Sequence, residues 1–197
     1  MTADGEAPDP DLSRRNVRLG AVVLAVLLGA VGLSMLRGAR ATGAPALEGA
    51  LRSSLERDGC TADSRTDEGR RHQPLVNYTV DPPAGGDHDA APSKAGFYEP
   101  GTVPTDGHLV HSLEHGFVIV WYKPDSVAPT TLEALRALAE RADWVLVAPR
   151  ASMPTALAAT SWHRRLLCPD GALAPIGTFV KTFRDKGPEK GFVAISY

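Results

Sequence analysis

The chain has 197 residues and a formal net charge of −2. A charge so close to neutral, without a basic stripe, gives no electrostatic basis for binding nucleic acid, so that class of function is excluded. Sixteen prolines and nineteen glycines predict many turns. When the apolar segment near the N-terminus is set aside, about 150 residues remain, which suits a single domain.

The first predicted element is a membrane-spanning helix at Leu19–Leu36, a run that contains no charged residue. As a helix it would be about 27 Å long, close to the thickness of about 30 Å of a bilayer's hydrocarbon core. This favours a single-pass protein with a cytoplasmic N-terminus, because positive charge is denser before the run than after it. The flanking arginines are Arg14, Arg15 and Arg18 on one side and Arg37 and Arg40 on the other.

This segment predicts the domain organisation. We expect a disordered cytoplasmic leader at residues 1–18, a transmembrane signal anchor at 19–36, a linker at 37–45 and an extracytoplasmic α+β domain at 46–197. A cleaved signal peptide is the alternative, since Ala39-Arg40-Ala41 offers a small-x-small cleavage site. Both interpretations export the rest of the chain. The anchor interpretation places it in the cell membrane, bound through this helix, and leaves a protein or cell-wall partner unidentified.

The two cysteines of the chain, Cys60 and Cys168, lie at opposite ends of the exported part. In an oxidising compartment such a pair predicts a disulfide. Two unrelated buried thiols are the alternative, and a third interpretation makes Cys168 a ligand of a soft metal ion.

Hydrophobic periodicity and turn residues predict helices and strands that build one small mixed sheet, the α+β class, with a long Pro/Gly-rich loop at 81–107. A loop of that length without secondary structure is usually functional. In chain order the expected elements are a helix at 46–60, strands at 74–80 and 117–122, a helix that begins near Thr130, strands at 144–148 and 156–163, a helix at 173–184 and an edge strand at 192–197.

Three details of these elements can be tested. Thr130 and Glu133 have the spacing of a capping box at a helix start. The strands at 117–122 and 144–148 flank this helix, so they are expected to be parallel with a right-handed crossover. The strand at 156–163 is expected to pair antiparallel with 144–148.

The segment Val110–Tyr122 has the most informative pattern, because His111, Glu114 and His115 stand within five residues and an apolar run follows. On a helix, residues four apart lie on one face with Cβ atoms about 5–6 Å apart and could share a metal ion. On a strand the same residues would be about 13 Å apart and could not. Gly116 would end such a helical turn.

Several motifs together resemble a known family. They are Tyr78, the stretch Pro82-Pro83-x-Gly85-x-x-His88, Gly96-x-Tyr98, the block from Val110 to Gly116, Trp162 and Pro188-Glu189. Over about residues 58–190 the chain resembles the bacterial "domain of unknown function 3105" family of membrane-anchored proteins. The resemblance implies an architecture and a location and leaves the activity open. One departure is that Gly85 stands where the family's proline loop has a serine, whereas His88 is in place.

Metal binding is the leading functional hypothesis. We expect His88, His111 and His115 to converge as ligands of zinc or copper, with Glu114 as a fourth ligand or as an acceptor that orients a histidine. Tyr78, Tyr98 and Tyr122 could line a pocket, Trp162 is expected to pack on the core, and His72 and His108 are expected to be solvated in polar loops.

Two alternatives remain open. In the first, the protein is a non-catalytic envelope module that binds a protein or cell-wall partner, and its histidines form a hydrogen-bonded latch. In the second, it is a metal-dependent hydrolase. The H-x-x-E-H pattern also occurs in zinc proteases, but these need a long helix, which the apolar residues directly after Gly116 do not favour.

Overall fold

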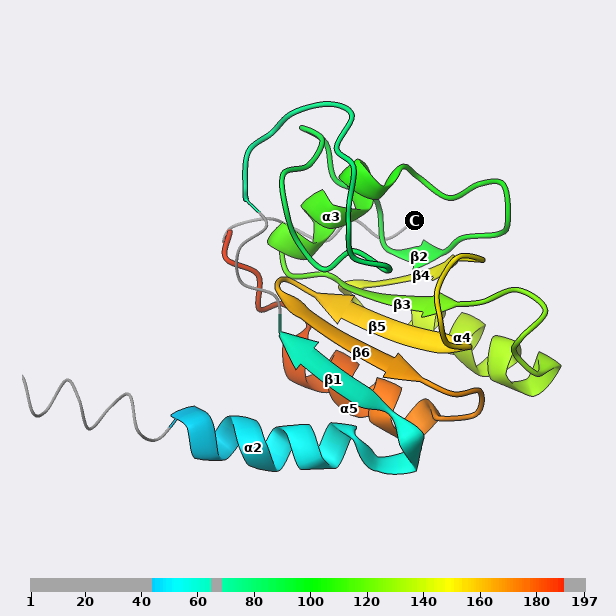
Figure 1. Cartoon of the computed structure of the whole chain (residues 1–197). Helices are drawn as coiled ribbons and strands as arrows, with labels where there is room; N and C mark the ends of the chain where they lie inside the picture. Colours follow the sequence, from blue (N-terminus) through cyan, green and yellow to red (C-terminus); the bar gives the residue numbers. More distant parts are fainter. Residues whose placement is uncertain (1–43, 65–68, 190–197) are drawn as a thin grey trace, which may run out of the picture. The chain divides into compact units, whose positions relative to one another are not determined.

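The computed structural model describes residues 44–64 and 69–189 (Figure 1). The predicted leader, the apolar segment at 19–36, most of the linker and the edge strand at 192–197 lie outside the described residues. Within the described ranges, no helix has the length and apolar character needed to cross a membrane. The chain divides into two compact units, residues 1–50 and 51–197, and the features below belong to the second, apart from the first residues of helix α2 (Ala44–Leu55).

A six-stranded mixed sheet forms the centre of this second unit, as the α+β prediction requires. The strand order is β1-β6-β5-β3-β4-β2. Strand β3 pairs parallel with β4, and β2 pairs parallel with β4, while the other neighbours are antiparallel. The strands are β1 (Thr61–Ser64), β2 (Gly96–Phe97), β3 (Val118–Tyr122), β4 (Val145–Pro149), β5 (Leu157–Ser161) and β6 (Arg164–Cys168).

The central strand β3 is buried along its whole length, which explains why its sequence is an unbroken apolar run. Its alternate residues enter two separate clusters. Val118 and Val120 pack in the cluster that includes residues of α4 and α5, whereas Ile119 and Trp121 pack with residues of α3. Figure 1 shows α3 and the long loops on one face of the sheet, with α5 on the other. The helices are α2 (Ala44–Leu55), α3 (Asp106–Glu114), α4 (Pro129–Arg141) and α5 (Leu173–Phe183), with a 3₁₀ turn at Arg57–Gly59.

The predictions for the second half of the chain are largely confirmed. The strands at 117–122 and 144–148 are parallel, and a helix joins them. The closing helix is α5. The predicted bond between Cys60 and Cys168 is present, and it ties the residue before β1 to the end of β6.

Three predictions about individual elements were wrong. Residues 74–80 form bends and no strand, and Leu75 has a φ of 57° and is 96% exposed, so the alternating pattern there reflects no buried face. Strand β5 pairs with β3 and not with β4, because β2 already occupies the other edge of β4. Helix α4 begins at Pro129, whose fixed φ suits a first helical position, so Thr130 does not cap it.

Candidate metal centre

Helix α3 places the histidine-rich motif in helical geometry and so decides between the two alternatives left open by the sequence. The helix ends in a Schellman motif: the Gly116 N–H donates to the Leu113 carbonyl at 3.0 Å and the Phe117 N–H donates to the Ser112 carbonyl at 3.0 Å. Gly116 supplies the required positive φ, 100°. His111 therefore lies one turn before His115, and the centroids of their stacked rings are 4.7 Å apart.

Two loop segments bring further histidines to this helix end. His72 and His88 form an isolated parallel β-bridge, with the Gln73 N–H donating to the His88 carbonyl at 2.8 Å and the His88 N–H donating to the Arg71 carbonyl at 3.0 Å. The Asp87 carboxylate accepts hydrogen bonds from the Arg71 N–H at 2.8 Å and from Gln73 Nε2 at 2.6 Å. The backbone thus fixes the two imidazoles side by side.

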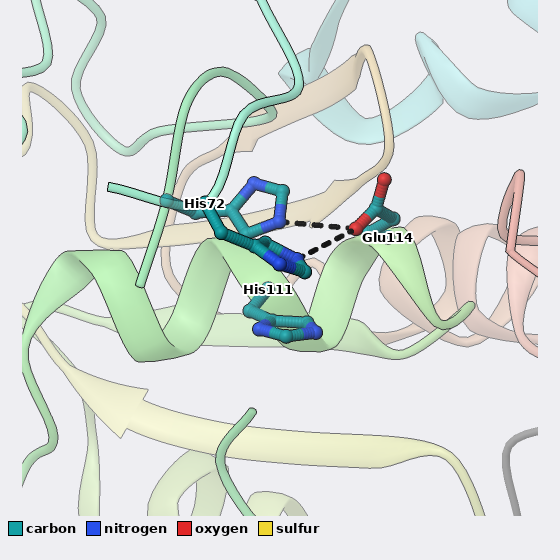
Figure 2. A group of neighbouring side chains, drawn as sticks. His72, His111 and Glu114 are labelled. Atoms are coloured by element: carbon teal, nitrogen blue, oxygen red, sulfur yellow. Dashed lines mark hydrogen bonds and ion pairs between the residues drawn. The ribbon is translucent and has the colours of Figure 1, made fainter. Parts of the chain in front are cut away.

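Four side chains form what we call the inner set: His72, His88, His111 and Glu114. Each offers one ligand atom, and these atoms all lie within 4.8 Å of one another. The ring centroid of His111 is 4.7 Å from that of His72 and 4.8 Å from that of His88. Figure 2 shows the His72 ring beside the Glu114 carboxylate, with His111 below them on α3.

Backbone carbonyls fix the tautomers of two of these histidines. His88 Nδ1 lies 2.8 Å from the Gly86 carbonyl oxygen, and His111 Nδ1 lies 2.7 Å from the Asp89 carbonyl oxygen. Because a carbonyl can only accept, we assign a proton to Nδ1 in both rings, so Nε2 is the nitrogen of each ring that remains for a ligand. His88 Nε2 is 3.0 Å from Glu114 Oε2, so a proton or another cation must lie between these two acceptors. Metal-binding histidines likewise donate the N–H of the other ring nitrogen to a carbonyl or carboxylate oxygen.

The Glu114 carboxylate is nearly enclosed, with 3% of its side chain exposed. Burial raises the pKa of Glu114, but the hydrogen bond from Arg70 and the charges of His88 and Arg70 outweigh it, so the pKa lies below its usual value. The hydrogen bond to Glu114 in turn raises the pKa of Arg70. Burial lowers the pKa of His111. At neutral pH the carboxylate is therefore charged and the imidazole of His111 neutral, the forms that bind metal ions.

A second group, the outer set, consists of His111, His115 and Glu189, and its ligand atoms also lie within 4.8 Å of one another. His115 Nδ1 is 3.8 Å from Glu189 Oε2. Burial lowers the pKa of His115. The structure thus groups the four predicted ligands differently from the prediction: His88, His111 and Glu114 share one set, and His115 joins Glu189 in the other.

His72 and Glu189 were missed as candidate ligands. His72 was expected to be solvated, and 49% of its side chain is exposed, yet its ring contacts His88 and His111. No pattern in the sequence around His72 predicts these ring contacts, because they depend on the β-bridge to a segment sixteen residues away. Pro188-Glu189 was noted as a family motif, and together with Arg70, His72 and Glu114 these two residues line an open hollow beside the inner set.

The remaining candidates have backbone partners. Tyr78, Tyr98 and Tyr122 donate their hydroxyls to three different carbonyls, those of Asp87 (2.7 Å), Lys94 (2.9 Å) and Tyr98 (3.5 Å), and a pocket lined by the three stays a prediction. Trp162 packs on the core as expected, and its ring meets the His88 ring edge-on at 5.8 Å.

Helix α3 bears on the hydrolase alternative. It has nine residues and ends at Glu114. The long helix on which zinc proteases carry the H-x-x-E-H pattern is therefore not formed here, and the arrangement gives that alternative no support.

Comparison with known proteins supports the family resemblance. A family model described as "Protein of unknown function (DUF3105)" matches residues 71–194, well over half of the chain. The match includes both histidine loops, α3 and Glu189. Neither the curated proteins nor the solved structures contain a match. The chain belongs to the DUF3105 family, and within that family's boundaries lie all the residues of the candidate metal centre.

Proposed function

We propose that this protein is an exported, membrane-anchored domain that binds one transition metal ion, zinc or copper, through the inner set. The observation that carries the proposal is the convergence of one ligand atom from each of three histidines and Glu114 within 4.8 Å, with Nδ1 of His88 and of His111 held by backbone carbonyls so that Nε2 of each ring remains for an ion. Three imidazoles and one carboxylate form a four-ligand shell typical of zinc.

The dimensions of the inner set are compatible with a single ion. Ligand atoms on a tetrahedral ion at about 2.0–2.1 Å are separated by about 3.4 Å. The four ligand atoms lie within 4.8 Å, so closing on an ion requires side-chain shifts of about 1 Å, which the half-exposed His72 can make. Copper, which imidazole also suits, fits the same donors.

Location outside the cytoplasm agrees with this function. The Cys60–Cys168 disulfide indicates an extracytoplasmic domain, because cytosolic thiols are kept reduced. Anchoring through the apolar segment at 19–36 is part of the proposal and rests on its length and its lack of charge.

The second candidate function is a non-catalytic envelope module in which the histidines are a latch. One observation favours it: Glu114 already pairs with Arg70 through Oε1 and with His88 through Oε2. In that case the network only holds the loops at 70–73 and 86–89 against α3.

Metal analysis of the full chain, purified in detergent without a histidine tag, separates the two functions. We expect one equivalent of bound zinc or copper after loading and dialysis, and a higher melting temperature; an ion at one hundred times its Kd stabilises the fold by about 2.7 kcal/mol. His72→Gln should weaken binding and should still fold, because the side chain is half exposed. His88→Gln, which removes a fully buried ligand of the inner set, should weaken binding more than His72→Gln does.

The matched control is His108→Gln, a half-exposed histidine on α3 that belongs to neither set. It should bind like the wild type. A wild-type protein that holds no stoichiometric ion and does not melt higher with zinc or copper would leave the latch as the function.

A further inference from the structure

The inner and outer sets share one residue, His111. Its Nδ1 is held by the Asp89 carbonyl at 2.7 Å, so a single nitrogen, Nε2, remains for an ion. One imidazole nitrogen binds one ion at a time. The two sets therefore cannot both hold an ion with His111 as a ligand, and they are two alternative positions for the same ion.

Exposure differs between the two positions. In the outer set the Glu189 side chain is 44% exposed and that of His115 is 9% exposed. In the inner set the side chains of His88 and Glu114 are 0% and 3% exposed. Glu189 also lines the open hollow together with His72 and Glu114, so the more exposed carboxylate and two residues of the inner set border the same solvent-accessible space.

The chain holds Glu189 in this place by backbone contacts. The Glu189 N–H donates to the Glu114 carbonyl at 3.2 Å, and the Asp185 N–H donates to the Gly116 carbonyl at 2.8 Å. Gly187 lies against the end of α3 so closely that a Cβ there would overlap the Glu114 carbonyl oxygen. The segment 185–189 is thus fixed to the helix that carries both sets.

We propose that the outer set is a loading position, from which the ion moves to the inner set by exchanging ligands around His111. This rests on the proposed function. A divalent cation first meets the Glu189 carboxylate and binds Glu189, His115 and His111 Nε2. It keeps the bond to His111 while Glu114, His72 and His88 replace Glu189 and His115. The proton held between His88 Nε2 and Glu114 Oε2 leaves to solvent as the ion replaces it. No electron is transferred, and the ion is never without protein ligands.

The test measures the rate of Zn²⁺ uptake by the full chain in detergent, by stopped-flow competition with a chromophoric chelator. Glu189→Gln removes the charge of the first ligand and should slow uptake at least about tenfold, the lower end of what a focused opposite charge contributes to association. Release passes through the same position and should slow by a similar factor, so the Kd should change by less than the rates do. Glu133→Gln, an exposed carboxylate on α4, is the matched control and should leave both rates unchanged.

A second measurement isolates the outer set. His72→Gln weakens the inner set, and this variant should still bind one equivalent of Zn²⁺ with lower affinity. The double variant His72→Gln/Glu189→Gln should lose most of this residual Zn²⁺ binding. Wild-type protein that binds two equivalents at once, or a Glu189→Gln variant with unchanged uptake, would overturn the loading position while leaving the inner site intact. Wild-type protein that binds neither Zn²⁺ nor Cu²⁺ would overturn the proposed function itself.

Discussion

Asp87, which belongs to neither set, holds the segment that carries His72. Its carboxylate accepts hydrogen bonds from the backbone and guanidinium of Arg71 and from Gln73, the residues on either side of His72. The hydrogen bond from Arg71 keeps the pKa of Asp87 below its usual value, so the group is a charged acceptor at neutral pH. Asp87 is thus the residue that couples the position of His72 to that of the neighbouring His88.

Asp87→Asn should therefore weaken metal binding about 10- to 100-fold, the usual effect of losing a group that orients ligands. The amide loses the charge and one acceptor, and His72 becomes free to move. Chelator competition with Zn²⁺ measures the change in Kd. The control is Asp125→Asn, an exposed residue with a φ of 63°, a conformation that asparagine also tolerates. A folded Asp87→Asn protein with wild-type affinity would show that Asp87 does not position His72.

At this scale the sequence predicted the candidate ligands that are neighbours along the chain, and it missed those that distant segments bring together. His111, Glu114 and His115 could be recognised because one helical turn brings them together, and Gly116 correctly marked its end. His88 was found through the family motif. His72 and Glu189 could not be found from spacing, because each reaches α3 through backbone contacts between distant segments.

At the scale of elements, the end of α3 and the segment 185–189 depend on two glycines. Gly116 has a φ of 100°, and a Cβ on it would lie 2.8 Å from the Gly187 nitrogen. A Cβ on Gly187 would overlap the backbone at Glu114 and Gly116. Because backbone atoms surround both positions, no flexible side chain can move aside.

Gly187→Ala should destabilise the protein by about 1–3 kcal/mol, the cost of forcing a strained local backbone, and should also slow Zn²⁺ uptake by displacing Glu189. Urea unfolding monitored by circular dichroism gives the stability. Gly177→Ala is the control: Gly177 lies inside α5 with nothing near its would-be Cβ, so alanine there should be neutral or stabilising by up to about 1 kcal/mol. Equal stability of the two variants would contradict this packing.

The disulfide leads to a second prediction at this scale, since it joins the residue before β1 to the last residue of β6, and these two strands also pair with each other. With a sequence separation of 108, its loss should cost about 4–5 kcal/mol in the chain-entropy model. Cys60→Ser and Cys168→Ser should each reduce stability in urea, and the double variant should be little worse than either one. Losses that add up would mean that the two residues act independently.

The strands that the sequence predicted correctly are those whose side chains are buried on both faces of the sheet. Strands β3 and β4 are apolar throughout because helices and loops cover both faces of the sheet. Strand β6 was missed because two arginines open it and Arg165 pairs with Asp63 on β1. The two residues of β2 give no periodic signal, and without β2 the partner of β5 could not be chosen correctly.

At the scale of the whole molecule, two features bear on where the protein is located: the disulfide of the folded domain and the uncharged apolar run at 19–36. The class of the exported domain was predictable because strands and helices alternate in the pattern of hydrophobic residues, and the disulfide agrees with export. Under the proposed function, the candidate metal centre would therefore take its ion from outside the cytoplasm.

The signal-anchor interpretation predicts that the mature protein keeps its first residues. We expect it to remain in the membrane fraction after alkaline carbonate washing, because a run of eighteen uncharged residues is long enough to span the hydrocarbon core. Mass spectrometry of the N-terminus should find residues before Leu19.

Replacing Arg14, Arg15 and Arg18 by glutamate should reduce correct orientation, because the positive charge that holds the N-terminus inside is then lost. Protease added to intact cells should degrade the domain in the wild type and spare it in a larger fraction of the variant. An N-terminus at Arg40 or beyond would establish cleavage instead, and the mature domain would then lack this membrane anchor.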